Sequence, residues 1–145
     1  MRKFEKVSTA DNGIIPTRSD VGSAGYDFYA VEDLTIKPQE MVKFKTNIKA
    51  CMEKDEVLLL YVRSSIGIKK NLMLCNGTGV IDSTYYNNPD NEGNIFCTLF
   101  NYGTETQEIK AGDRVMQGVF VKYLITDDDN TVNEIRTGGI GSTGN

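Results

Sequence analysis

A regular alternation of side chains from residue 42 to residue 50 constrains the fold of this chain more than any other stretch. Val42, Phe44, Thr46, Ile48 and Ala50 alternate with three lysines and one asparagine. Successive side chains of a β-strand point to opposite faces, so this period of two predicts one strand with a buried face and a basic, solvated face. The continuous apolar run at 57–62 predicts a second strand that is buried on both faces.

Shorter runs of strand-forming residues recur along the rest of the sequence, with turn residues between them. We expect strands within residues 1–10, 23–30, 34–36, 72–75, 95–100 and 115–123, and one short helical turn within 66–72. The strand at 23–30 by itself predicts that Asp27 faces solvent. Helical periodicity persists nowhere beyond a few residues. Many short strands at regular spacing predict an all-β sandwich or barrel.

The length and charge of the chain limit its organisation and its partners. A chain of 145 residues fits a single domain, here with a core at 1–131 and a flexible C-terminal arm at 132–145. The net charge of −4 argues against a nucleic-acid partner, but a free nucleotide with a divalent metal is compatible with it. The sequence has no apolar run of membrane-spanning or signal-peptide length, so we expect no membrane partner and a cytoplasmic protein.

The sequence contains no histidine, and this narrows its chemistry. Serine–histidine and cysteine–histidine catalysis and histidine-bound zinc are excluded. Cys51, Cys75 and Cys97 form no CxxC pair and are expected to be buried free thiols. An enzyme of this composition would use a carboxylate as its base and an oxygen-ligated ion such as Mg²⁺.

The stretch at 76–86 combines a bend with groups suited to a polar ligand. Gly77 and Gly79 suit a tight hairpin or a close backbone approach. Asp82 then lies at a concave rim, where it could orient a water molecule, and Tyr85 could stack on a sugar or a base. A β-turn with a capping aspartate explains the same residues.

Two other stretches have both a phosphate-binding and an ordinary interpretation. Glycine makes up four of the last ten residues, so this tail loses too much backbone entropy to fold alone. Its amides, hydroxyls and arginine could close over a polyphosphate, or it could be a disordered C-terminus. Arg63-Ser64-Ser65, at the end of the buried strand, could hold a phosphate or form a polar loop.

Five stretches, taken together and in this order, resemble the trimeric deoxyuridine triphosphatase (dUTPase) family. They are Ala24–Ala30, Arg63–Ser65, Gly79–Tyr85, Gly112–Gln117, and Arg136 with Gly138–Gly144. The resemblance implies a jelly-roll β-sandwich, a homotrimer, and three active sites that each combine segments of all three subunits. It also implies hydrolysis of dUTP to dUMP and pyrophosphate with Mg²⁺, which keeps uracil out of DNA and supplies dUMP for thymidylate synthesis.

The resemblance further implies a role for each matched residue. Asp82 would orient the water that attacks the α-phosphate, and Asp27 would hold the metal through water. Tyr85 would stack under the deoxyribose, and Asp113 would pair with Arg63. Uracil would be read by Asn76, by the main chain of Gly79, Val80 and Ile81, and by a main-chain group near Phe96. The phosphates would be held by Arg63, Ser64, Ser65, Gln117, Arg136, Ser142 and Thr143, with Ile140 and Gly141 covering the base.

The sequence departs from the family pattern at several places. Thr84 replaces a second aspartate, Ser65 replaces a glycine, and Ile140 replaces the phenylalanine that stacks on uracil. The loop after Tyr85 is longer than usual by about six residues, and the spacing from Arg136 to Gly138 is short. These departures leave two other functions open: a trimeric interaction protein that binds nucleotide without turnover, and a relative of the deoxycytidine triphosphate deaminases.

Overall fold

The computed structural model describes residues 1–131, and these form an all-β fold with two single helical turns. The strands are β1 Lys3–Lys6, β2 Tyr26–Tyr29, β3 Leu34–Ile36, β4 Met41–Lys45, β5 Ile48–Cys51, β6 Glu56–Val62, β7 Leu72–Leu74, β8 Gly79–Asp82, β9 Phe96–Asn101, β10 Gln107–Ile109 and β11 Arg114–Lys122. The helical turns are η1 Ser65–Lys69 and η2 Ser83–Tyr85. No helix of this part of the chain is long and apolar enough to cross a membrane.

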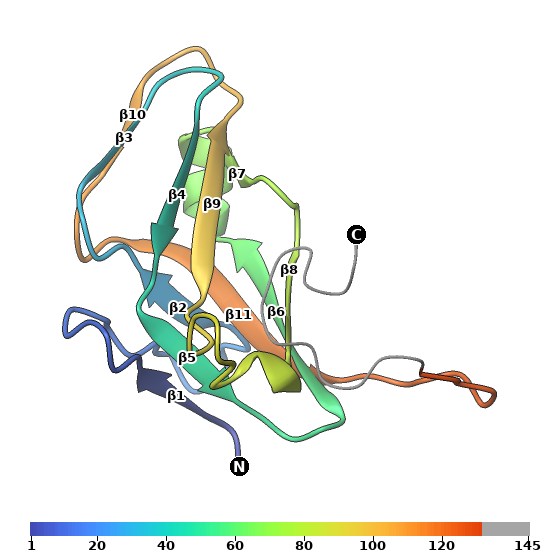
Figure 1. Ribbon diagram of the computed structural model, residues 1–145. Helices are drawn as coiled ribbons and strands as arrows, with labels where there is room; N and C mark the ends of the chain where they lie inside the picture. The colour runs from blue at the N-terminus through green and yellow to red at the C-terminus, as the bar shows by residue number, and fades with distance from the viewer. Residues whose placement is uncertain (132–145) are drawn as a thin grey trace.

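The strands form two larger sheets and two short ribbons, as expected for a jelly-roll β-sandwich (Figure 1). The larger sheets have the orders β2-β11-β6-β8 and β4-β9-β7, and the ribbons pair β1 with β5 and β3 with β10. Every strand pairing is antiparallel. One apolar cluster between these layers, centred on Phe28, Leu58, Leu99 and Val115, excludes water almost completely and supplies the main driving force for folding.

The single strand predicted for residues 42–50 is in fact two strands. The chain breaks at Thr46 and Asn47, so that β4 pairs with β9 while β5 pairs with β1. Asn47 has a φ of 60°, which asparagine tolerates better than most residues. The Thr46 hydroxyl donates to the Ile95 carbonyl at 2.7 Å, which fixes this corner against a distant segment.

Strand β6 lies in the middle of its sheet, between β11 and β8, and within residues 1–131 only one of its faces is fully closed. Leu58 and Leu60 are 0% and 2% exposed on the inner face. On the outer face Val57 is buried, Leu59 is half-buried and Tyr61 is exposed. Among the described residues, the prediction that this strand is buried on both faces is therefore confirmed at Val57 and wrong for the rest of the outer face.

The hairpin predicted around Gly77 is a crossover between the two sheets. β7 pairs with β9, and β8 pairs with β6, so the two strands that flank the bend lie in different sheets. The bend is closed by a hydrogen bond from the Gly77 amide to the Leu74 carbonyl at 2.9 Å. Gly77 has a φ of 72°, which only glycine adopts without strain.

Three smaller expectations have mixed outcomes. The helical turn expected within 66–72 is present as η1. Strand β10 was not predicted, because Gln107 and Glu108 give it neither an apolar run nor an alternation of side chains. All three cysteines are free, as expected, but only Cys97 is buried: Cys51 is half-buried and Cys75 is exposed in the bend that follows β7.

Candidate active site

The edge strand β8 carries the centre of the matched motif. One of its edges pairs with β6, from Leu60↔Gly79 to Val57↔Asp82, and β8 is the last strand of that sheet. The other edge therefore offers main-chain donors and acceptors to a ligand. Gly79 is glycine because an added Cβ would lie 2.9 Å from the Cβ of Leu60, a contact too short for real atoms.

Asp82 ends this strand and directly precedes η2. It is half-buried and occupies the position before the first helical residue, with an extended backbone. Its side chain makes no capping hydrogen bond to that helical turn. The sequence left open a β-turn with a capping aspartate, and at η2 the side chain of Asp82 does not act as a cap.

Tyr85 lies three residues further on, at the end of η2, and packs into the apolar cluster. The residue is 7% exposed. Its hydroxyl donates to the Asn94 carbonyl at 2.8 Å and accepts a hydrogen bond from the Asn91 side-chain amide at 2.8 Å. The ring is therefore fixed from its hydroxyl end, within a few residues of Asp82.

A separate pocket of about 290 Å³ opens beside β2, at the opposite edge of the same sheet. It brings together four of the proposed site residues: Asp27, Arg63, Ser64 and Gln117. The pocket is also lined by Ser19, Ser23, Ala24, Gly25 and Val119. None of these five was proposed as a site residue, although the run of small residues before β2 was a usable signal for an open cavity.

The charged groups of this pocket form a small cluster around Asp27. Arg63 Nε lies 3.0 Å from one carboxylate oxygen of Asp27, and Arg114 Nη1 lies 3.6 Å from the other. Asp27 is 5% exposed, so the prediction that it faces solvent is wrong. The predicted pair of Arg63 with Asp113 is also wrong, because Asp113 accepts a hydrogen bond from the Lys110 amide instead.

Gln117 is positioned by strand pairing on both sides. It lies opposite Asp27 on β2 and opposite Tyr61 on β6. A Cβ on Gly25 would overlap the side-chain oxygen of Gln117, so the glycine makes room for the amide. The pocket is lined by one guanidinium group and several neutral hydrogen-bonding groups, and a second guanidinium group, of Arg114, lies behind Asp27. These groups suit an anion such as a phosphate.

A metal ion fits this pocket only if it binds together with an anionic ligand that supplies some of its ligands. Among residues 1–131 no group of three or more His, Cys, Asp or Glu side chains could cage a metal ion. Asp27 is the carboxylate that lines the pocket, and it is already paired with arginine. Mg²⁺ commonly enters sites of this kind on substrate phosphates, keeping several waters and needing one or two carboxylates.

Asp82 and Asp27 are far apart within one chain. They lie on the two edge strands of one sheet, which are three strand spacings apart. Along the strands, Asp27 is level with Gln117 of β11, whereas Asp82 is level with Val121, four residues further on. With ~4.8 Å between strands and ~3.4 Å per residue, the two carboxylates are roughly 20 Å apart. This exceeds what one triphosphate could bridge, so the described chain does not assemble these two parts into one site.

The other matched residues lie outside both regions. Asn76 is exposed in the bend, and Ser65 starts η1 without lining the pocket at Asp27. Phe96 lines a third pocket, of about 390 Å³, and the Lys43 ammonium group lies 4.5 Å from the centre of its ring. Arg136, Ile140, Gly141, Ser142 and Thr143 lie outside the described residues.

Comparisons with known proteins agree on one family. The sequence model of the dUTPase family matches residues 11–144. The chain is 50% identical over 147 aligned positions to a deoxyuridine 5'-triphosphate nucleotidohydrolase of Lactococcus lactis, covering 99% of this chain and 98% of that protein. It is 33% identical to the protein of the same name from Wolinella succinogenes, covering 98% and 94%. The crystal structure of a dUTPase from Streptococcus mutans superposes with a TM-score of 0.80 at 43% identity, covering 86% of this chain and 98% of that one.

Proposed function

The chain belongs to the dUTPase family and is a dUTP diphosphatase, and from this premise we propose how its residues act. It hydrolyses dUTP to dUMP and pyrophosphate, with a water molecule oriented by Asp82 attacking the α-phosphate. The observation that carries this proposal is the position of Asp82, at the end of β8, which is the edge strand of its sheet within the described residues. A carboxylate of ordinary acidity suffices, since phosphoryl transfer depends on alignment and charge neutralisation.

The base is read by main-chain groups beside Asp82. The unpaired edge of β8, over Gly79, Val80 and Ile81, donates and accepts hydrogen bonds with the polar edge of uracil, and Asn76 adds its side-chain amide. Strand β7 pairs with β9 only at Leu99–Asn101, so the start of β9 near Phe96 offers a further main-chain contact. Tyr85 lies under the deoxyribose and leaves no space for a 2′-hydroxyl.

The triphosphate is held by the pocket at Asp27 together with the arm. Arg63, Ser64 and Gln117, with Ser65 at the start of η1, contact phosphate oxygens. From the arm come Arg136, Ser142 and Thr143, while Ile140 and Gly141 cover the base. Mg²⁺ on the phosphates neutralises their charge, and Asp27 contacts the ion through water.

A homotrimer brings the two separated halves together. The ~20 Å between Asp82 and Asp27 in one chain supports an arrangement in which one subunit supplies the base-binding edge and the catalytic acid while another supplies the phosphate pocket. Within residues 1–131 the outer face of the β6 sheet is largely apolar and partly exposed, with Val80 56% exposed and Val121 37% exposed. After β11 the chain runs away from the body of the domain (Figure 1), with Leu124 96% and Ile125 68% exposed. These surfaces are the expected contacts with the other two copies.

In the cell this activity keeps uracil out of DNA and supplies dUMP for thymidylate synthesis, and the enzyme acts in the cytoplasm. It needs no nucleic-acid or membrane partner for this reaction. The chain's net charge of −4 supports the absence of a polynucleotide partner.

The test is release of pyrophosphate from dUTP and Mg²⁺ by the unaltered protein and by Asp82→Asn. The substitution keeps the shape but removes the charge that orients water, so kcat should fall by about 10²–10⁴-fold. Asp90→Asn, a neutralised carboxylate in the exposed loop that follows, should keep the activity of the unaltered protein. Full activity of Asp82→Asn, or no pyrophosphate from the unaltered protein, contradicts the proposal. Ammonia released from dCTP would instead identify a deaminase.

A further inference from the structure

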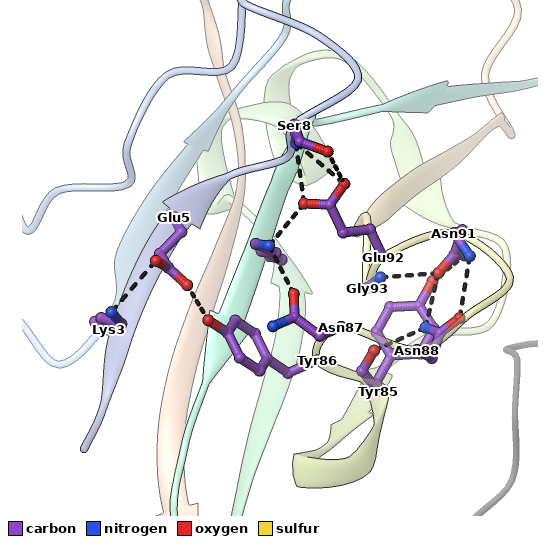
Figure 2. A network of polar contacts seen from close by, with 11 residues as sticks. Lys3, Glu5, Ser8, Tyr85, Tyr86, Asn87, Asn88, Asn91, Glu92 and Gly93 are labelled. Atoms are coloured by element: carbon purple, nitrogen blue, oxygen red, sulfur yellow. Dashed lines mark hydrogen bonds and ion pairs between the residues drawn. The ribbon is translucent and has the colours of Figure 1, made fainter.

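The loop at residues 86–94 encloses the hydroxyl end of Tyr85 (Figure 2). The phenol donates to the buried main chain at Asn94 and accepts from Asn91, both at 2.8 Å. A third contact holds the backbone of the tyrosine, since the Asn88 side-chain amide donates to the Tyr85 carbonyl at 2.7 Å. The ring and its main chain are therefore both held by the same loop.

The orientation of the Asn91 amide is fixed by its other end. Its oxygen accepts hydrogen bonds from the Asn88 side chain at 2.8 Å and from the Gly93 amide at 3.0 Å. Rotating the amide by half a turn would place a donor against both of these donors, so its nitrogen must face the phenol. Because Asn91 can only donate there, the phenol proton is directed to the Asn94 carbonyl, and the direction of both hydrogen bonds is determined.

The loop itself is anchored to the segment around β1 and to β5, which form a separate two-stranded ribbon. Glu92 accepts hydrogen bonds from the Ser8 amide and hydroxyl and forms an ion pair with Lys49 at 2.6 Å. Tyr86 donates to Glu5 on β1 (Figure 2). A loop anchored at both its outer and its inner side transmits little motion to the tyrosine ring.

We propose that Asn91 is a positioning residue that sets the plane of the Tyr85 ring against the sugar and thereby the preference for deoxyribose over ribose. This inference rests on the proposed function, in which Tyr85 stacks under the deoxyribose. A ring that can tilt makes space for a 2′-hydroxyl, whereas a ring held at its hydroxyl cannot. Asn91 acts through the phenol and does not touch the substrate.

The experiment is a double-mutant cycle of Asn91→Ala and Tyr85→Phe, read as the ratio of kcat/KM for dUTP to kcat/KM for UTP. Each single variant removes the hydrogen bond between Asn91 and the phenol and should lower this ratio about fivefold, the effect of one hydrogen bond. The double variant should equal Tyr85→Phe, because Asn91 has no phenol to act on. Asp90→Ala, at an exposed position of the same loop, is the control and should leave the ratio unchanged.

Two results would overturn the inference while the proposed function stands. The first is a ratio of kcat/KM for dUTP to kcat/KM for UTP that Asn91→Ala leaves unchanged. The second is that Asn91→Ala lowers this ratio as much in the Tyr85→Phe variant as it does in the unaltered protein. The second result would mean that the loop acts by packing alone. If the alanine variant fails to fold, Tyr85→Phe alone carries the test, since it removes the same hydrogen bond and leaves the contacts of Asn91 with Asn88 and Gly93 in place. No dUTP hydrolysis by the unaltered protein would overturn the proposed function and this inference with it.

Discussion

The surroundings of Tyr85 and the pocket at Asp27 differ in how much of each is completed by one chain. Tyr85 is surrounded by a network of hydrogen bonds of 2.7–3.0 Å that lies within nine residues of sequence. It consists of the side chains of Asn88 and Asn91 and the Asn94 carbonyl. At Asp27 the pocket is open, and its lining includes small residues such as Ser23 and Gly25. The first region fixes an aromatic ring, whereas the second supplies charge and space for a ligand that other segments must help to hold.

This difference indicates which side chains must be held in a fixed position for the proposed function. Discrimination between two sugars depends on one hydroxyl group, so the surface beneath the sugar must not move. A triphosphate is flexible and highly charged, and it can be gathered by mobile or separately contributed groups. The contrast can be tested by replacing glycines with alanine, because each region contains a glycine at which an added Cβ would lie too close to a neighbouring atom.

The largest effect is expected from Gly25→Ala at the phosphate pocket. The new Cβ would displace the flexible end of Gln117, so folding should be little affected while a hydrogen bond to phosphate is lost. A hydrogen bond to a charged group is worth about 1.5–3 kcal/mol, so kcat/KM for dUTP should fall about tenfold to a hundredfold. Steady-state kinetics and a thermal melt measure the two effects.

Gly22→Ala is the matched control, since its Cβ would make only an ordinary contact of 3.5 Å with Asp20. Equal kinetics for the two alanine variants would show that Gln117 takes no part in binding phosphate.

A smaller effect, on stability rather than turnover, is expected from Gly93→Ala in the loop behind Tyr85. Gly93 has a φ of 92°, and an added Cβ would lie 2.8 Å from the Tyr85 carbonyl oxygen. This backbone cannot yield, so the substitution should cost about 2 kcal/mol, or roughly 5–8 °C in Tm.

Gly112→Ala separates the cost of the positive φ from the cost of the contact with Tyr85. Gly112 has nearly the same φ, 93°, but an added Cβ there would have nothing within 4 Å. The loss of stability beyond that of Gly112→Ala measures the contact with Tyr85. Equal losses would mean that the loop does not press on the tyrosine.

The smallest effect concerns the outer anchor of the loop. Hydrogen bonds from Lys49 and Ser8 lower the pKa of Glu92 from 4.5 to about 2. A carboxyl with a depressed pKa in the folded state stabilises it above the unfolded pKa and loses this contribution as the pH falls through the folded value. The unaltered protein should therefore exceed Glu92→Gln in Tm at pH 6, and the difference should shrink between about pH 4.5 and pH 2.

Thermal melts of both proteins across this range test the prediction, with Asp90→Asn as the control for simple loss of a charge. A difference that stays constant down to pH 2 would exclude the ionised Glu92 as an anchor.

Much of the fold could be predicted because alternation of side chains is a local property. Val57–Val62 and Val115–Tyr123 gave nearly the bounds of β6 and β11. The break at Asn47 could not be predicted, since it depends on Asn94 and Ile95, nearly fifty residues away. The crossover at Gly77 was likewise mistaken for a hairpin, because the sequence shows a bend but not which partners the flanking strands choose.

The candidate site divides in the same way. The sequence by itself determined the family, the all-β class and the residues matched to the family's motifs, because these depend on residue types and their order. Only the tertiary structure decided that Asp27 is buried against Arg63, that Tyr85 is held by Asn91, and that Asp82 lies at the opposite sheet edge from the pocket at Asp27. The reason is physical: burial, ion pairing and strand order are contacts between distant segments, and a sequence pattern of period two says which face a side chain takes but not what covers that face.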